Sequence, residues 1–148
     1  MPTRDVPHFI LQAHEVRVGD ELDTDWTTHA DWSEEQRLRD VRNELIRAQL
    51  QEGKTVAYRQ SGWSLWPRVH SNDLCCYLPV RFDLQVGVGD IVFCQVQPQG
   101  YYYAHLVKDK EYMADLSCYR YWISNLKGRV NGYTFLQFIY GKLFQVLH

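Results

Sequence analysis

Hydrophobic residues follow two different periods along this chain, and the change falls near Gly53. In residues 33–52 they recur at intervals of three and four, which is typical of an amphipathic helix. Ser33 and Gln36 form an S-x-x-Q capping signature at the start of this segment, and Gly53 follows its end. The predicted apolar stripe consists of Leu38, Val41, Leu45 and Ala48, widened by Ile46 and Leu50. A one-sided helix of this kind covers a core more often than it binds a partner.

After Gly53 the apolar residues alternate or form short runs, which indicates strands. Segments rich in Gly, Pro or Asn separate these runs and predict turns at residues 85–90, 97–100 and 127–132. The pattern predicts a mainly β (α+β) fold, a small coiled antiparallel β-sheet or barrel with one N-terminal amphipathic helix. The expected strands are residues 54–60, 73–80, 90–96, 101–107, 119–125 and 141–147.

The domain organisation follows from length and charge. A chain of 148 residues suits one domain with its own core. Residues 1–32 carry more acidic than basic side chains and predict an N-terminal arm, partly packed on the domain and partly mobile. Residues 33–148 are expected to form the single domain, beginning with the helix at 33–52.

Composition excludes several classes of function. The formal net charge of −2 gives no general basic surface for nucleic acid. No run of about 18 apolar residues predicts a membrane-spanning helix. The four cysteines lack C-x-x-C spacing, so we expect reduced thiols and neither a disulfide framework nor a zinc site. This favours a cytoplasmic or nuclear location, and no cofactor or metal is predicted.

Candidate chemistry centres on Ser64, which stands between Trp63 and Trp66 in a segment able to fix its position. A serine hydroxyl becomes nucleophilic only beside a base. His105 is the candidate, because strand alternation puts it on one face with Tyr103. A histidine on an aromatic face is more often structural, so the residues alone leave both roles open.

The motif around Ser64 resembles the signal-peptidase and repressor self-cleavage superfamily of serine proteases. That family carries G-x-S-M-x-P, and residues 62–67 read G-W-S-L-W-P, with Leu65 in place of Met. The family's G-D turn before a strand is matched at Gly89 and Asp90. Its closing I-x-G-K/R-V strand is matched by I-Y-G-K-L at residues 139–143. The strand A-H-L-V at residues 104–107 is similar to the His-base version found in eukaryotic signal peptidases. These motifs cover about two thirds of the chain.

The resemblance implies a signal-peptidase-like fold and hydrolysis of a peptide or protein substrate by a Ser64/His105 dyad. Substrate contacts are then expected from Trp63, Leu65, Trp66 and Tyr103. The family's acidic box after the base strand has only neutral counterparts here, Asn125 and Asn131.

Two other functions compete with the enzyme. A non-catalytic module on the same fold would bind an extended peptide by strand addition, using the aromatic residues near Ser64. Nucleic-acid binding by Tyr and Trp stacking is weaker, because stacking platforms normally lie in a positive groove.

Overall fold

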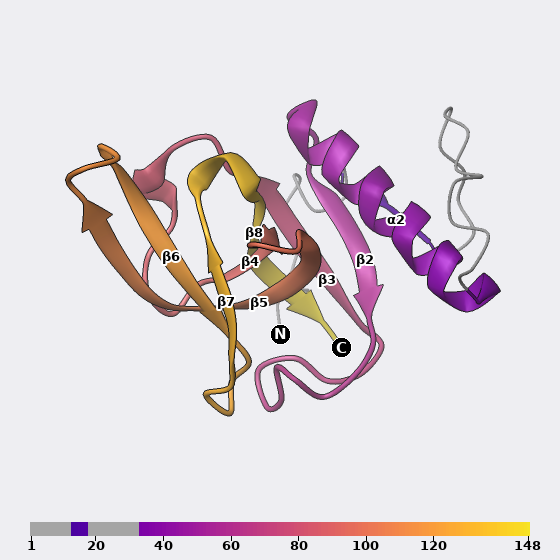
Figure 1. Cartoon of the computed structure of the whole chain (residues 1–148). Coiled ribbons are helices and arrows are strands. Elements are labelled where there is room, and N and C mark those ends of the chain that lie inside the picture. The colour runs from indigo at the N-terminus through magenta and orange to yellow at the C-terminus, as the bar shows by residue number, and fades with distance from the viewer. Residues whose placement is uncertain (1–12, 18–32) are drawn as a thin grey trace, which may run out of the picture.

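The computed structural model describes residues 13–17 and 33–148 and is mainly β. Eight strands form one open mixed sheet in the order β1-β2-β3-β8-β4-β5-β6-β7, with one α-helix lying beside β2 (Figure 1). Only the pairing of β1 with β2 is parallel. The elements are β1 (His14–Glu15), α2 (Glu34–Gln51), β2 (Val56–Gln60), β3 (Asp73–Pro79), the 3₁₀ turn η1 (Asp83–Gln85), β4 (Ile91–Val96), β5 (Tyr101–Met113), β6 (Cys118–Ser124), β7 (Val130–Thr134), the 3₁₀ turn η2 (Leu136–Phe138) and β8 (Ile139–Leu147).

The ends of α2 confirm the capping prediction. The Ser33 hydroxyl accepts a hydrogen bond from the backbone N–H of Gln36 at 3.2 Å. At the other end Gly53 has a φ of +87°, a left-handed conformation that glycine adopts without a Cβ penalty. A surface ion pair also joins Arg39 to Glu35 one turn earlier, at 2.8 Å. Local sequence therefore sets the length of this helix.

The buried face of α2 is narrower than the predicted stripe. Ile46 and Leu50 are its fully buried residues, whereas the four positions of the predicted stripe are only half-buried. Leu50 packs on β8 at Gly141, where an added Cβ would lie 2.8 Å from a Leu50 methyl carbon. The glycine of the closing-strand motif thus lets the helix approach the sheet closely.

The sheet separates two hydrophobic clusters. Ile46 and Leu50 join the first, in which Tyr58, Tyr77 and Phe93 pack ring against ring. The second lies among the later strands and is built from the buried residues Val80, Val86, Val92, Cys94, Val96, Val107, Tyr121, Ile123 and Ile139. Successive residues of β4 alternate between the two clusters, as the period of two requires.

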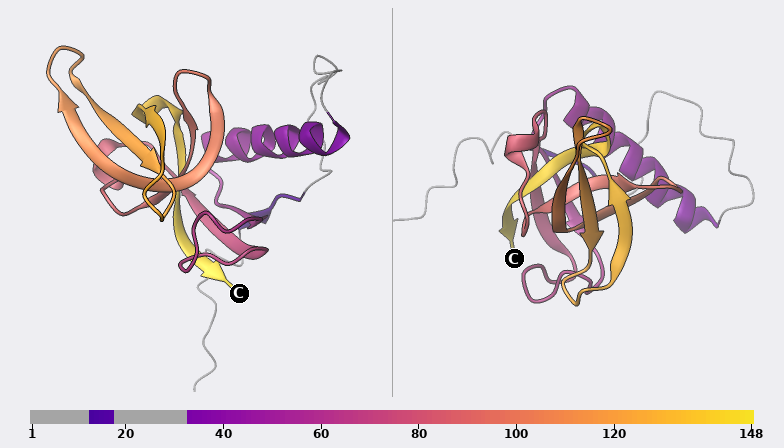
Figure 2. Two further views of the ribbon diagram at one scale, coloured as in Figure 1. Left: turned by 60° about the horizontal axis from the view of Figure 1, so that its bottom comes forward. Right: turned by 60° about the vertical axis from the view of Figure 1, so that its left-hand side comes forward.

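Strong coiling brings strands together that are not neighbours in the sheet. Gln60 at the end of β2 donates from Nε2 to the carbonyl oxygen of Ala104 on β5 at 3.3 Å. Gln97, just after β4, forms an isolated antiparallel bridge with Tyr133 on β7. Figure 2 shows the long, curved β5 sweeping from the helix side of the molecule to the far end. The coiled sheet was predicted, but it remains open, so the closed barrel is not formed.

Three strand predictions needed correction. β5 continues to Met113, six residues beyond the predicted end, because it pairs with β6 after a bulge at residues 107–109. Residues 130–132, predicted as a turn, belong to β7. The short β1 pairs with β2 although no strand was predicted before the helix, and Val16, just after it, is buried. The predicted mobility of the arm concerns residues 1–12 and 18–32, which lie outside the described residues.

Two further features concern membrane-spanning helices and cysteines. The described part of the chain contains no helix that is both long enough and apolar enough to cross a membrane. All four cysteines are free, and three of them are buried.

Candidate active site

Ser64 lies in the loop between β2 and β3, and several hydrogen bonds fix that loop. Gly62 has a φ of +96° and donates its N–H to the Ser71 hydroxyl, which closes the loop at its base. The Ser64 carbonyl accepts from the N–H of Leu126 in the β6–β7 connection at 3.0 Å. The Ser64 side chain is half-buried, so the frame positions a hydroxyl that solvent still reaches.

The structure brings the two predicted catalytic residues together. His105 on β5 has its Nε2 3.0 Å from Ser64 Oγ, although the two residues are 41 positions apart. This separation lies within the range of a hydrogen bond between nucleophile and base. The Tyr103 ring packs against the imidazole, with 4.9 Å between ring centroids, and holds it on the expected face of β5.

Asn131 on β7 completes a row of three side chains. Its Oδ1 lies 2.6 Å from His105 Nδ1 and accepts a hydrogen bond from that nitrogen when Nδ1 is protonated. Nε2 is then the unprotonated nitrogen and can accept the Ser64 hydroxyl proton. Asn131 therefore selects the tautomer in which His105 can act as a base.

Burial sets the protonation of the imidazole. Desolvation lowers the pKa of His105 below its ordinary value, and the hydrogen bond that Nδ1 donates to Asn131 opposes this shift only in part. Within residues 13–17 and 33–148 no carboxylate hydrogen-bonds to the ring, and the lowered pKa favours a neutral His105 at pH 7. A neutral imidazole is the form that takes a proton from serine.

Ser64 and His105 open into a cleft of about 380 Å³ between the sheet and the first half of α2. Tyr103 also lines this cleft, as predicted for a substrate-contacting residue. No acidic side chain lines it among the described residues, whereas Arg39 and Arg42 both do. Arg42 is the more buried of the two, and its Nε has no hydrogen-bond partner in the described part of the protein.

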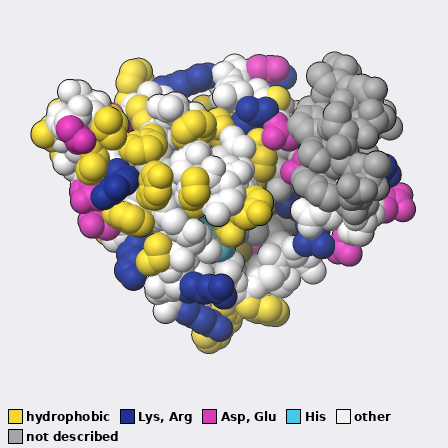
Figure 3. Space-filling view, in the orientation of Figure 1, with side chains coloured by type: hydrophobic (Ala, Val, Ile, Leu, Met, Phe, Trp, Pro, Cys, Tyr) yellow, Lys and Arg dark blue, Asp and Glu magenta, His cyan; other side chains and the backbone are white. Residues whose placement is uncertain are grey.

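The other predicted substrate contacts are distributed differently. Leu65 is only 2% exposed and packs in the first hydrophobic cluster, so the prediction that it contacts substrate is wrong. Trp63 and Trp66 are exposed and line a separate hollow of about 260 Å³ with Lys127. In Figure 3 hydrophobic and basic side chains lie together at the lower edge of the molecule, where Figure 1 has the β2–β3 and β6–β7 loops.

Asn125 binds its own loop instead of His105, because its Oδ1 accepts from the N–H of Arg129.

Two of the quoted motifs meet on the far side of the sheet. Asp90 follows Gly89, whose φ is +95°, and accepts from the N–H of Gly87 at 2.8 Å. The same carboxylate oxygen lies 3.2 Å from Lys142 Nζ on β8. This pair is partly exposed and contributes modestly to stability, but it fixes the β4 and β8 ends in register.

Comparison with protein-family models, curated protein sequences and solved structures found no match to this chain.

The sequence left Asn125 and Asn131 as alternative neutral partners of His105, and the structure places Asn131 there. The arginines of the cleft were missed. Asn131 precedes Gly132, and such a pair is a strong turn signal. Here the glycine serves a close approach instead: an added Cβ would lie 2.6 Å from Val96 Cγ1 and 2.9 Å from the Gln97 carbonyl oxygen. The arginines stand on the polar face of the helix, and a helical period alone does not distinguish a solvated face from a cleft wall.

Proposed function

We propose that this chain is a serine endopeptidase of the signal-peptidase and repressor self-cleavage superfamily, with Ser64 as nucleophile and His105 as general base. The observation that carries the proposal is the 3.0 Å contact between Ser64 Oγ and His105 Nε2, backed by Asn131 at 2.6 Å. The free thiols support a reducing compartment such as the cytoplasm or nucleus as its location.

The mechanism follows from the row of three side chains. Ser64 Oγ attacks the peptide carbonyl carbon while His105 Nε2 accepts the hydroxyl proton. The carbonyl oxygen becomes an oxyanion, which the backbone N–H groups at Ser64 stabilise. His105 then donates the proton to the leaving amine, and the ester on Ser64 is hydrolysed by water that His105 activates. Asn131 holds the ring throughout, as a neutral asparagine does in papain-like Cys-His-Asn sites.

The test of the proposal is covalent labelling of the purified chain by a fluorophosphonate. The probe phosphonylates an activated serine, so we expect one adduct, located on Ser64 by peptide mass spectrometry. Denatured protein is the control, since it keeps the hydroxyl and loses the dyad. Absence of an adduct on the folded protein would contradict the proposal.

The charge of the cleft indicates the class of substrate. Arg42 Nε is buried without a described partner, and burying an unpaired charge is costly. The Arg42 guanidinium also lies over the Tyr58 ring at 5.1 Å, and its Nη2 donates to Asn43 Oδ1 at 3.4 Å. A carboxylate of a bound peptide would supply the missing acceptor, so we expect a preference for peptides with Asp or Glu near the scissile bond.

Replacing Arg42 with Gln tests this preference. We expect kcat/KM for Glu-containing peptides to fall about tenfold relative to otherwise identical Gln-containing peptides, since a hydrogen bond to a charged group contributes about 1.5–3 kcal/mol. Arg37→Gln is the matched control, because Arg37 is exposed on the same helix and does not line the cleft. An equal loss on both peptides would assign Arg42 a structural role.

A second prediction concerns Asn131→Asp. A carboxylate stabilises the imidazolium formed during attack, so we expect the labelling rate above pH 7 to rise about tenfold. The same charge raises the pKa of His105, so the loss of activity on acidification begins at a higher pH than in the unmodified protein. Labelling rates between pH 5 and 9 measure both effects. Asn125→Asp is the control. An equal change in its labelling rate and pH dependence would show that Asn131 has no specific role in the mechanism.

The alternative function is a catalytically inactive peptide- or protein-binding module on the same fold. The exposed Trp63 and Trp66 favour it, because exposed aromatic residues are common anchors in interfaces. This module would bind peptides without reacting with the fluorophosphonate, so the labelling experiment separates the two functions.

A further inference from the structure

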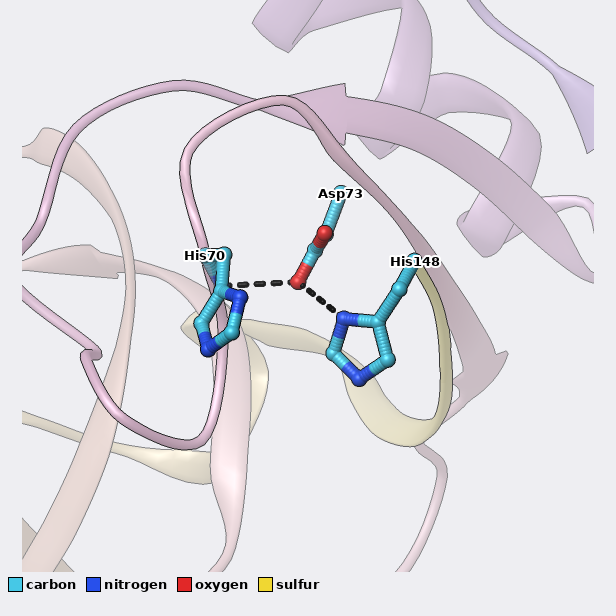
Figure 4. A group of neighbouring side chains, drawn as sticks. All are labelled: His70, Asp73 and His148. Atoms are coloured by element: carbon cyan, nitrogen blue, oxygen red, sulfur yellow. Dashed lines mark hydrogen bonds and ion pairs between the residues drawn. The ribbon is translucent and has the colours of Figure 1, made fainter.

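We propose that His70, Asp73 and His148 form a binding site for a divalent transition-metal ion, with Zn²⁺ the best match to its ligands. Figure 4 shows the three side chains converging from two segments at the ends of β3 and β8. Each offers one ligand atom, and the three atoms lie within 4.8 Å of one another. This site is separate from the cleft at Ser64 and does not depend on the proposed peptidase activity.

The backbone, and not chance side-chain placement, brings these residues together. β3 and β8 are antiparallel with Leu74 opposite Leu147, so the next residues outward, Asp73 and His148, lie side by side. A tight turn adds His70, since the Asp73 N–H donates to the His70 carbonyl at 3.0 Å and the His70 N–H donates to Asp73 Oδ2 at 2.7 Å. Sheet register and turn therefore fix all three Cα positions.

The ligand types suit zinc. Two imidazoles and one carboxylate are a common three-ligand set for Zn²⁺, and water takes the fourth, tetrahedral position. His148 Nδ1 already lies 2.8 Å from Asp73 Oδ2, and the two imidazole rings have centroids 5.1 Å apart. Zinc–ligand bonds of about 2.0–2.1 Å place ligand atoms about 3.3 Å apart, so small rotations of the two histidines suffice.

The burial of the Asp73 carboxylate distinguishes this site from an ordinary surface ion pair. Asp73 is only 6% exposed, whereas both histidines are exposed. A nearly buried carboxylate needs a positive partner. A metal ion would neutralise the carboxylate, and the exposed rings would leave a path for the ion to enter. The hydrogen bond from the His70 backbone holds the carboxylate in place, as the outer hydrogen bonds of metal sites do.

Binding would connect the loop that carries Ser64 to the end of β8. A ligand that binds only the folded protein raises its stability, so the site would also stabilise this loop. Sequence spacing gave no hint of it, because His148 is 75 positions from Asp73.

The test uses the complete chain without a histidine tag, treated with a chelator and titrated with ZnCl₂ by calorimetry. We expect one equivalent of Zn²⁺ to bind and to raise the melting temperature by several degrees. His70→Ala and His148→Ala should each weaken binding at least tenfold. His14→Ala is the control, because His14 is an exposed histidine on β1 outside this cluster.

Cobalt substitution identifies the ligands. Co²⁺ bound by nitrogen and oxygen gives visible ligand-field bands without the intense near-ultraviolet thiolate band that cysteine would add. A thiolate band, or affinity equal in the His70→Ala/His148→Ala double variant and the unmodified chain, would overturn the proposal. So would the absence of binding to correctly folded protein.

Discussion

Replacement of Ser64 by Ala is expected to abolish fluorophosphonate labelling and to reduce peptide hydrolysis by at least about 10³-fold. Alanine removes the hydroxyl oxygen that lies 3.0 Å from His105 Nε2. The substitution is small and the side chain only half-buried, so the free energy of unfolding should change by less than about 1 kcal/mol. Labelling kinetics and casein hydrolysis measure the loss of activity, and thermal unfolding checks the fold.

Ser61→Ala is the matched control, because Ser61 lines the same cleft and does not contact His105. It should label at the rate of the unmodified chain. Labelling of the Ser64→Ala protein at an undiminished rate would show that another residue reacts. That result would contradict the proposed role of the Ser64/His105 dyad.

Local signals in the sequence predicted the helix well. Ser33 and Gly53 act through hydrogen bonds and backbone angles within a few residues, so no tertiary information was needed. The interior of the helix was harder, since Ile46 and Leu50, predicted only to widen the stripe, are its most deeply buried residues. That choice depends on Gly141, about 90 residues away, and on where it lets the helix approach.

The strands show the same division between local and distant causes. Alternation located six of them, but it did not predict the length of β5 or the existence of β7. Both depend on pairing with β6, and the register shifts where β5 passes from Val107 to Asp109 and where β7 passes from Val130 to Gly132. The two-residue β1 has no pattern of its own, because its parallel pairing with β2 alone defines it.

The site was predictable where chemistry restricts the choice of residue. The residues alone left the role of His105 open, and the resemblance of the motifs pointed to Ser64 and His105, whose side-chain atoms lie within hydrogen-bond distance. Leu65 was assigned to substrate because it is next to Ser64, yet adjacent residues in a tight loop point in different directions, and Leu65 points into the core. Asn125 and Asn131 were both candidates for the partner of His105, and the turn signal at residues 131–132 concealed the strand that places Asn131 beside the imidazole.

His105→Ala carries the other large expected effect, a loss of labelling and hydrolysis of at least about 10³-fold. The imidazole is the group within hydrogen-bond distance of Ser64 Oγ that can remove its proton, and alanine cannot replace it. The double variant with Ser64→Ala should be no less active than either single variant, because residues that act as one unit are not additive. Rates measured for all three proteins complete this cycle.

The free energy of unfolding of the same His105→Ala protein distinguishes a catalytic base from a structural histidine. Burial lowers the pKa of His105, so the folded protein binds this proton more weakly than the unfolded chain does. The histidine therefore makes the protein lose stability as the pH falls from the ordinary histidine pKa towards the lowered one, and His105→Ala should remove that part of the acid sensitivity. At pH 8, where the ring is neutral in both states, we expect a cost of about 1–2 kcal/mol for the lost packing and for the unpaired Asn131. Urea unfolding at pH 8 and pH 5 measures both quantities. Failure of the His105→Ala protein to fold, or full labelling by that protein once folded, would mean that the contact with Ser64 serves the structure alone.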